Sequence, residues 1–161
     1  EEAGITSALL NLGTSTISLV GSKADGSPWR VAVRDPADES GTLCVLELSD
    51  CALSTSGGYE RYFEEDGQVY HHILDPKTGA PAQSGLSSVT VVTEQGTDAD
   101  VWSTALYVMG TGEALDFWRQ EGGFECILCQ ADGTVLVTEG LEGKLNTEES
   151  GDGYTFEIVR R

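Results

Sequence analysis

The segment Tyr70–Pro81, which reads Tyr-His-His-Ile-Leu-Asp-Pro-Lys-Thr-Gly-Ala-Pro, constrains most strongly how this chain can fold. It contains both histidines and two of the four prolines of the protein. The pattern from Gln68 to Leu74 predicts a strand, in which neighbouring side chains point to opposite faces. His71 and His72 therefore cannot both face one site.

A tight bend follows this strand. Asp75-Pro76 stops the strand, because proline has no N–H to donate and fixes its own φ, and Gly79 can take the positive φ that a turn requires. One histidine, Asp75 and Thr78 are thereby brought together at a strand end. The residues alone leave two interpretations open: an ordinary turn that closes a hairpin, or part of a functional site.

The composition indicates an acidic globular protein. The chain has 161 residues, of which 39% are hydrophobic, and this predicts a single domain over residues 1–161. Its formal net charge of −18 disfavours binding to nucleic acid or to an anionic bilayer surface. An anionic ligand would need a local positive feature or a metal. We expect no membrane-spanning stretch and no signal peptide within this sequence.

Four cysteines raise the question of a metal or redox site, and Cys126-Ile-Leu-Cys129 has CxxC spacing. This pair lies in an expected strand, where residues three apart point to opposite faces and cannot chelate one ion. We therefore predict that Cys44, Cys51, Cys126 and Cys129 are all free thiols that behave as small hydrophobic residues.

Alternation and β-branched residues predict strands along most of the chain. We expect an antiparallel meander, in which the fourth and fifth strands form a hairpin through Ser49-Asp50. The predicted strands are Ser7–Leu12, Ile17–Val20, Trp29–Arg34, Thr42–Leu48, Ala52–Ser56, Tyr59–Phe63, Gln68–Leu74, Ser87–Val92, Glu125–Cys129, Val135–Thr138 and Tyr154–Val159.

Helical periodicity appears mainly after these first eight strands. A helix is predicted from an N-cap at Thr97 or Asp98 to Gly110, followed by a shorter helix at Glu113–Gln120. The segment Glu1–Gly4 is predicted to be the end of another helix. Antiparallel strands with a few helices packed on one side indicate the α+β class.

The start of the long helix is a second candidate site. Asp100 and Thr104 lie four residues apart and therefore on one face, close to the free N–H groups of the helix N-terminus. A carboxylate and a hydroxyl placed in this way suit a hard divalent cation that bridges phosphates. The alternative is that Asp100 is simply a favourable acidic residue near a helix N-terminus.

A third candidate is Ser54-Thr55-Ser56-Gly57, where small hydroxyl side chains and a glycine would let a flat ring or a phosphate approach the backbone. The alternative for this segment is a plain turn at the end of a strand.

Several segments, taken in order, resemble the ApbE family of FAD:protein FMN transferases, also described as thiamine-biosynthesis lipoproteins. The most specific is His72-Ile-Leu-Asp-Pro-Lys-Thr-Gly-Ala-Pro81, and the resemblance covers nearly the whole chain but only the C-terminal half of a family member. The other matching segments are Asn11–Gly13, Asp25–Val31, Arg34–Pro36, Ser54–Gly57 and Ala99–Ala105.

The resemblance implies a T-fold-like α+β architecture, of which this chain is a partial domain. It also implies Mg²⁺-dependent cleavage of the FAD pyrophosphate and transfer of the FMN moiety to a Thr or Ser hydroxyl of a target protein. Some members instead hydrolyse FAD to FMN and AMP. For the whole protein, the family implies an extracytoplasmic location with membrane anchoring.

The resemblance also implies roles for individual residues. Asp100 and Thr104 match the metal ligands, and His72 matches the motif histidine that assists removal of a proton from the attacking hydroxyl. The alternation of the strand then selects His72 over His71 as the inward residue. Flavin-binding positions carried over from the family are Gly13, Thr55, Ser56, Gly57, His72, Asp75 and Thr78, and Arg34 is either a ligand contact or half of a structural ion pair.

Two departures from the family pattern favour a different interpretation. Family members continue the first loop as Gly-Gly-Asn, where this chain has Gly13-Thr14-Ser15, and they carry an acidic residue at the position of Gly58. The alternative is therefore a degenerate, non-catalytic flavin-binding or structural domain that kept the fold.

Overall fold

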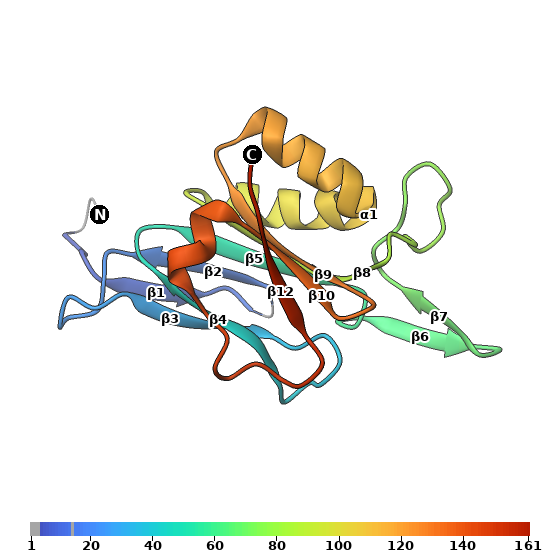
Figure 1. The fold of residues 1–161 in the computed structure, drawn as a ribbon, viewed down its shortest axis with the longest axis horizontal. Coiled ribbons are helices and arrows are strands. Elements are labelled where there is room, and N and C mark those ends of the chain that lie inside the picture. Colours follow the sequence, from blue (N-terminus) through green and yellow to red (C-terminus); the bar gives the residue numbers. More distant parts are fainter. Residues whose placement is uncertain (1–3, 14) are drawn as a thin grey trace.

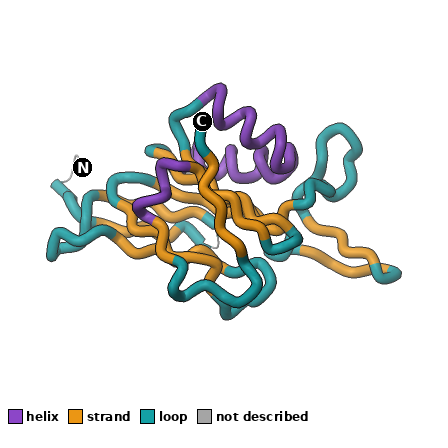
Figure 2. The backbone as a smooth tube through the Cα atoms, viewed as in Figure 1, coloured by secondary structure: helices purple, strands orange, loops and turns teal. Residues whose placement is uncertain are grey.

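A computed structural model describes residues 4–13 and 15–161. The structure has the predicted α+β architecture, in which the helix covers one face of a large sheet and a smaller sheet covers the other (Figure 1). A two-stranded arm projects from one end of this body (Figure 2). The helix end predicted at Glu1–Gly4 falls largely on residues 1–3, which lie outside the described residues.

The large sheet has seven strands in the order β1-β2-β5-β8-β9-β10-β12, antiparallel except for the β10–β12 pair. Its partner sheet has the order β11-β4-β3, and β6 with β7 forms the arm. The strands are β1 Ala8–Asn11, β2 Thr16–Val20, β3 Trp29–Arg34, β4 Thr42–Leu48, β5 Ala52–Gly57, β6 Tyr62–Glu65, β7 Gln68–His71, β8 Leu86–Thr93, β9 Glu125–Gln130, β10 Thr134–Thr138, β11 Leu145–Asn146 and β12 Thr155–Val159.

Alternation along the central strands divides the core into two layers. In β9, Ile127 and Cys129 pack between the two sheets, while Cys126 and Leu128 pack under the helix with the fully buried Trp118. The two cysteines of the CxxC pattern thus lie on opposite faces of the sheet, as predicted, and all four cysteines are free thiols.

Helix α1 (Gly96–Glu121) consists of two helical segments that meet at Gly110, so the predicted break is confirmed. The predicted N-cap is wrong, because the cap is Gln95 and it makes no side-chain capping bond. Ala99 and Leu106 are buried against the sheet, and the helix starts two or three residues earlier than local capping signals suggest. None of the described helices is both long and apolar enough to span a membrane.

The predicted hairpin between β4 and β5 is wrong, and so is the simple meander. β4 pairs with β3 and β11 in the smaller sheet, whereas β5 pairs with β2 and β8 in the large one. The short connection around Asp50 therefore crosses from one sheet to the other. Both strands are buried along most of their length, which is what two stacked sheets require of their facing strands.

Smaller differences are one strand end and two elements that the sequence did not predict. β7 stops at His71 instead of continuing to Leu74, which forms only an isolated bridge with Pro81. The acidic loop after β10 contains an unpredicted 3₁₀ helix, η1 (Glu139–Lys144), and leads into the unpredicted β11.

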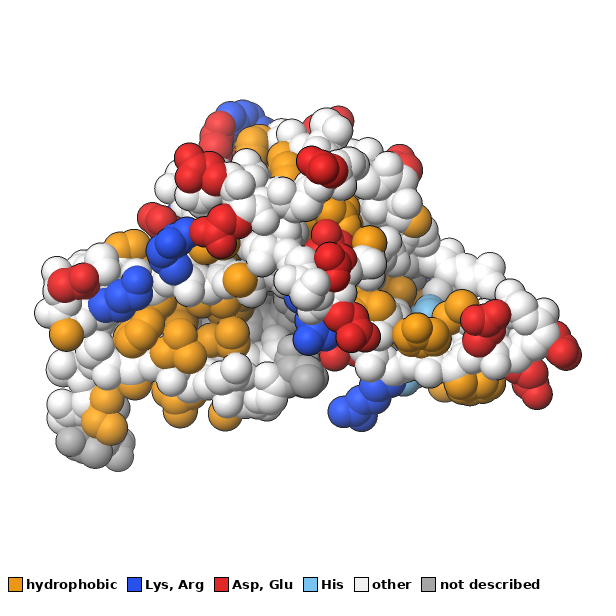
Figure 3. All heavy atoms as spheres, turned by 90° about the horizontal axis from the view of Figure 1, so that it is seen from below, with side chains coloured by type: hydrophobic (Ala, Val, Ile, Leu, Met, Phe, Trp, Pro, Cys, Tyr) orange, Lys and Arg blue, Asp and Glu red, His pale blue; other side chains and the backbone are white. Residues whose placement is uncertain are grey.

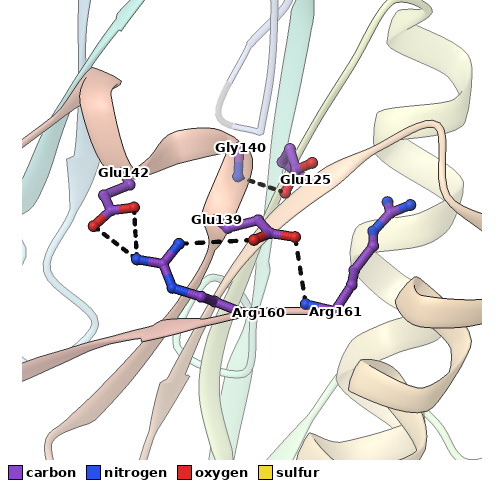
Figure 4. Close-up of polar contacts among 6 residues, drawn as sticks. All are labelled: Glu125, Glu139, Gly140, Glu142, Arg160 and Arg161. Carbon is purple, nitrogen blue, oxygen red and sulfur yellow. Dashed lines mark hydrogen bonds and ion pairs between the residues drawn. The ribbon is translucent and has the colours of Figure 1, made fainter.

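Arg160 pairs with Glu139 and Glu142 and helps tie η1 to the end of the chain (Figure 4). These groups are exposed, so each pair contributes little to stability.

Gly110 offers a direct test of this helix break. Its φ of 76° and ψ of 171° lie in a region that is open essentially to glycine alone, and an added Cβ would stand 3.1 Å from the Ser84 carbonyl oxygen. We expect Gly110→Ala to lower the free energy of unfolding in urea by about 1 to 3 kcal/mol. Gly112→Ala is the matched control, because its Cβ meets nothing within 4 Å. Equal effects of the two substitutions would contradict the strained break.

Candidate functional site

The site begins where β5 passes under the start of α1. Alternation along β5 sends Leu53 into the core between the sheets and Ser54 toward the helix. The Ser54 hydroxyl is fully buried and lies 3.3 Å from Asp100 Oδ1, to which the Thr16 hydroxyl also donates at 3.3 Å. Two hydroxyl groups from neighbouring strands thus hold the Asp100 carboxylate in place.

One turn further along the helix, the same face presents hydroxyl groups. Ser56 Oγ lies 2.9 Å from Ser103 Oγ and 3.0 Å from Thr104 Oγ1. Thr104 Oγ1 also donates to the Asp100 backbone carbonyl at 3.3 Å. Asp100 and Thr104 therefore share a face, as predicted, and Ser56 links that face to β5.

His72 approaches the site from the base of the arm. Its backbone N–H donates to the Arg61 carbonyl at 3.1 Å, and its ring Nδ1 lies 3.2 Å from the same oxygen. A carbonyl can only accept, so this contact places the ring proton on Nδ1 and leaves the lone pair on Nε2. That tautomer suits a group that accepts a proton through Nε2.

His71 points the other way, so the predicted opposition of the two histidines is confirmed. Its Nε2 donates to the Ala82 carbonyl at 3.1 Å, and its ring meets the Tyr107 ring edge-on with 5.7 Å between centroids. Of the two, His72 lines the cavity with Asp100 and Thr104. His71 is half-buried, whereas His72 is exposed. His71 packs into the body, and His72 faces an open cavity.

That cavity has a volume of about 190 Å³ and collects side chains from four segments. Ser56, Gly57, His72, Asp100 and Thr104, all predicted as site residues, line it. Through Thr104 it adjoins a cavity of about 740 Å³ with a largely apolar wall. That wall includes Leu74, Pro76, Val101, Ala105, Val108 and Met109.

The bend after the arm borders this larger cavity. Asp75 Oδ1 accepts the Lys77 N–H at 2.8 Å, and the Asp75 carbonyl accepts the Gly79 N–H at 2.8 Å. Thr78 Oγ1 accepts the Ala80 N–H at 3.2 Å, and Gly79 has the predicted positive φ, 69°. Asp75 and Thr78 therefore shape the loop through their own backbone contacts, and their contact with a flavin stays a prediction.

The structure places Gly13 apart from His72 and Asp100. Gly13 lines a cavity of about 330 Å³ at the opening between the two sheets, together with Arg34. Thr55 also borders this cavity, and its hydroxyl pairs with Thr90 at 2.8 Å. Arg34 Nη1 lies 3.6 Å from Glu60 Oε1, so it forms an ion pair while lining the cavity. The predicted flavin-binding residues thus line several adjoining cavities. Thr55 borders both this cavity and the one with His72, while Asp75 borders the larger apolar cavity and, with Thr78, another beside it.

The donor set fits a hard divalent cation. Asp100 and Thr104 offer a carboxylate and a hydroxyl oxygen, and the nearby side chains of Thr16, Ser54 and Ser56 are hydroxyls as well. In the part of the chain that the structure describes, no three His, Cys, Asp or Glu side chains gather in a metal cluster. An ion with so few protein ligands matches Mg²⁺, which keeps waters and takes further oxygens from substrate phosphates.

Sequence reasoning missed several residues of this region. Thr16, Ser103, Glu60 and Arg61 all border or support the cavity, and the role of Ser54 as a buried partner of Asp100 was not expected. Period-two spacing from Ser56 would have indicated Ser54, since both must face the helix. Thr16 lies too far away in the sequence for any such signal.

The fold and the site define an α+β protein with an oxygen-rich site between β5 and the first turns of α1, suited to a hard cation and, through it, to a phosphate-bearing ligand. The ApbE family model matches residues 1–128. The FAD:protein FMN transferase of Salmonella typhimurium is 40% identical over 123 residues, which cover 76% of this chain and 35% of that protein. The corresponding protein of Rhodobacter capsulatus is 36% identical over 98% of this chain and 29% of its own length.

Solved structures agree with this match. The ApbE protein of Thermotoga maritima has a TM-score of 0.76 and 36% identity, covering 86% of this chain and 44% of its own. The apo flavinyl transferase ApbE of Pseudomonas stutzeri has a TM-score of 0.68 and 33% identity, covering 93% and 45%. The chain belongs to the ApbE family, and it spans less than half the length of these relatives.

The buried thiols provide a test of the layered core beside this site. Burial raises the pKa of Cys44 and Cys126 to about 12 and that of Cys129 to about 11. A folded pKa above the unfolded one contributes stability at low pH that is lost as the pH rises from the unfolded value toward the folded one. We expect the free energy of unfolding in urea, measured under reducing conditions, to fall between about pH 9 and pH 12. Cys126→Ala should flatten this dependence, and an unchanged slope would contradict it.

Proposed function

We propose that this chain forms part of an FAD:protein FMN transferase that cleaves the FAD pyrophosphate with Mg²⁺ and transfers FMN to a Thr or Ser hydroxyl of a target protein. The observation that carries the proposal is the convergence of Asp100, Thr104 and His72 on one cavity. The proposal is further supported by the names of the relatives, which are FAD:protein FMN transferases. Export and membrane attachment of the whole protein stay predictions of the family resemblance.

Asp100 and Thr104 are the residues that would hold the cation. When bound, Mg²⁺ would neutralise negative charge that develops on the pyrophosphate oxygens. Ser54 and Thr16 would keep the Asp100 carboxylate oriented through their hydrogen bonds.

His72 would act on the acceptor. The acceptor hydroxyl oxygen forms a bond to the phosphorus that stays with FMN, the bond from that phosphorus to the bridging oxygen breaks, and AMP leaves. The hydroxyl proton passes to His72 Nε2, whose lone pair is free because Nδ1 faces the Arg61 carbonyl. The apolar wall of the larger cavity would cover part of the flavin ring, with Asp75 shaping its edge.

Hydrolysis of FAD to FMN and AMP is a second candidate. His72 is exposed and its cavity is open, so water can reach the position that an acceptor hydroxyl would occupy. Exclusion of water by a docked acceptor would favour transfer. A degenerate, non-catalytic domain would bind FAD without turnover. Calorimetric titration of the full-length protein with FAD, with and without Mg²⁺, measures binding, and release of FMN from the bound FAD then separates an enzyme from a non-catalytic domain.

We expect Asp100→Ala in the full-length protein to abolish Mg²⁺-dependent release of FMN from FAD, because it removes the carboxylate ligand. The measurement is chromatographic quantification of FMN over a Mg²⁺ titration. Asp98→Ala is the matched control: Asp98 is another exposed acid in the same turn and does not line the cavity. Unchanged FMN release in Asp100→Ala would refute the metal assignment.

For His72→Gln we expect the rate of transfer to fall by about 10²- to 10⁴-fold, the usual contribution of a general base. The affinity for FAD should change little, since the amide keeps much of the imidazole's polar reach. Single-turnover transfer and calorimetric FAD binding measure the two quantities separately. A loss of FAD binding with an unchanged transfer rate would assign His72 to binding instead.

A further inference from the structure

The β6–β7 arm has two chemically distinct faces. Because Phe63 lies opposite Tyr70 and Glu65 opposite Gln68 in the antiparallel register, these four side chains share one face. The Phe63 and Tyr70 rings stack on this face with 5.1 Å between centroids and 10° between planes. We call it the aromatic face. The opposite face carries Tyr62, Glu64, Val69 and His71.

An isolated two-stranded hairpin is marginal in water, and this one exposes large apolar groups. Phe63 is 60% exposed, and the arm stands away from the two core layers. Figure 3 shows hydrophobic side chains on the projecting arm between acidic ones. Exposed apolar side chains gathered on such a protrusion indicate a surface that is covered when a partner binds.

The aromatic face runs directly into the candidate site. The bond from the His72 N–H to the Arg61 carbonyl adds one more rung to the β6–β7 ladder, so His72 and Arg61 fall on the same side as Phe63 and Tyr70. Both His72 and Arg61 line the small cavity with Asp100. Tyr70 precedes His72 by two residues, a spacing of about 7 Å along a strand.

The opposite face leads elsewhere. Tyr62, Glu64, Val69 and His71 line a separate cavity of about 390 Å³ with Tyr59 and Tyr107, on the side of the arm away from His72. A partner bound there would have no direct path to His72. The two faces of one arm therefore differ in whether they reach the site.

Charge identifies the kind of partner. Glu64, Glu65 and Asp66 at the arm tip make no ion pair with a Lys or Arg among residues 4–13 and 15–161. Glu65 lies on the aromatic face itself. A segment that carried basic side chains would complement this tip. The open outer edge of β6 offers backbone groups to an extended chain.

We propose that the aromatic face docks the extended segment of the acceptor protein that carries the flavinylated Thr or Ser, with basic side chains of that segment facing Glu65 and Asp66. The inference rests on the proposed function, since it takes His72 as the point to which the hydroxyl must be delivered. Residues flanking that hydroxyl in an extended segment pass over Phe63 and Tyr70.

The test compares Phe63→Ala/Tyr70→Ala with Tyr62→Ala/Val69→Ala in the full-length protein. Tyr62 and Val69 are 59% and 51% exposed, so the control pair removes a similar apolar surface from the other face of the same arm. The acceptor is the protein that carries covalent FMN fluorescence in the native host, prepared unmodified from cells that lack the transferase. Readouts are the KM for this acceptor, the KM for FAD, FMN release to water, and the melting temperature.

We expect the aromatic-face variant to raise the KM for the acceptor by about tenfold or more, as truncation of aromatic anchors usually does. Its KM for FAD and its FMN release to water should stay unchanged, and the control variant should match the wild type. Glu65→Lys should also raise the acceptor KM and remove part of its dependence on salt.

Three outcomes would overturn the inference. Equal effects of both variants would make the arm a structural element with no docking face. A lower melting temperature with an unchanged acceptor KM would mean that another part of the same protein covers the aromatic face. A changed KM for FAD would assign the face to the nucleotide. If the wild type transfers no FMN to any protein, the proposed function itself fails, whereas transfer that ignores Phe63 and Tyr70 overturns the docking face alone.

Discussion

The contact between β5 and the start of α1 is the interaction on which the site depends. β5 is an inner strand of the large sheet, and both faces of the sheet are covered there. Its side chains therefore alternate between the apolar layer that packs on the smaller sheet and the layer that contacts the helix. The chain places Ser54 and Ser56 on the helix side. Buried hydroxyl groups are costly unless they are hydrogen-bonded, and Asp100, Ser103 and Thr104 satisfy them. The same bonds that make the packing possible hold the carboxylate and hydroxyl in place.

Strand positions could be predicted from the sequence because alternation and turn residues are local signals. The bounds of β3 and β4 agree with the prediction, and those of β2 and β9 differ by one residue. The pairing of β4 with β5 could not be predicted in this way. A short connection usually closes a hairpin, but here the segment around Asp50 passes from one of the stacked sheets to the other. The Asp50 carboxylate accepts a hydrogen bond from the Gly21 N–H, just after β2 of the large sheet. Which sheet a strand joins depends on burial of both its faces, and that is a property of the assembled layers.

The site residues, like the strands, divide into those that local sequence signals identify and those that only the assembled fold brings together. His72, Asp100 and Thr104 could be identified because each belongs to a contiguous motif, and the structure brings them to one cavity. The partners that orient them come from elsewhere: Thr16 from β2 and the Arg61 carbonyl just before β6. Gly13, which a loop motif identified, lines the adjoining cavity at the opening between the sheets, and its contact with a flavin stays a prediction. A sequence motif identifies candidate residues, but the order of the strands in the sheet determines which of them lie close together.

The adjacent residues His71 and His72 point to opposite faces, so the packing of the first determines the orientation of the second. His71 is bound on two sides, through Nε2 to the Ala82 carbonyl after the bend and through its ring to Tyr107 on α1. Gly58 lies against both of these side chains, since a Cβ there would stand 2.8 Å from the Tyr107 hydroxyl and 2.9 Å from the His71 ring. The base of the arm is thereby fixed to the body. Because neighbouring side chains on a strand must oppose each other, fixing His71 inward obliges His72 to face the site. An acidic side chain in place of Gly58 would collide with this arrangement, so the departure from the family pattern at this position is matched to the packing of His71.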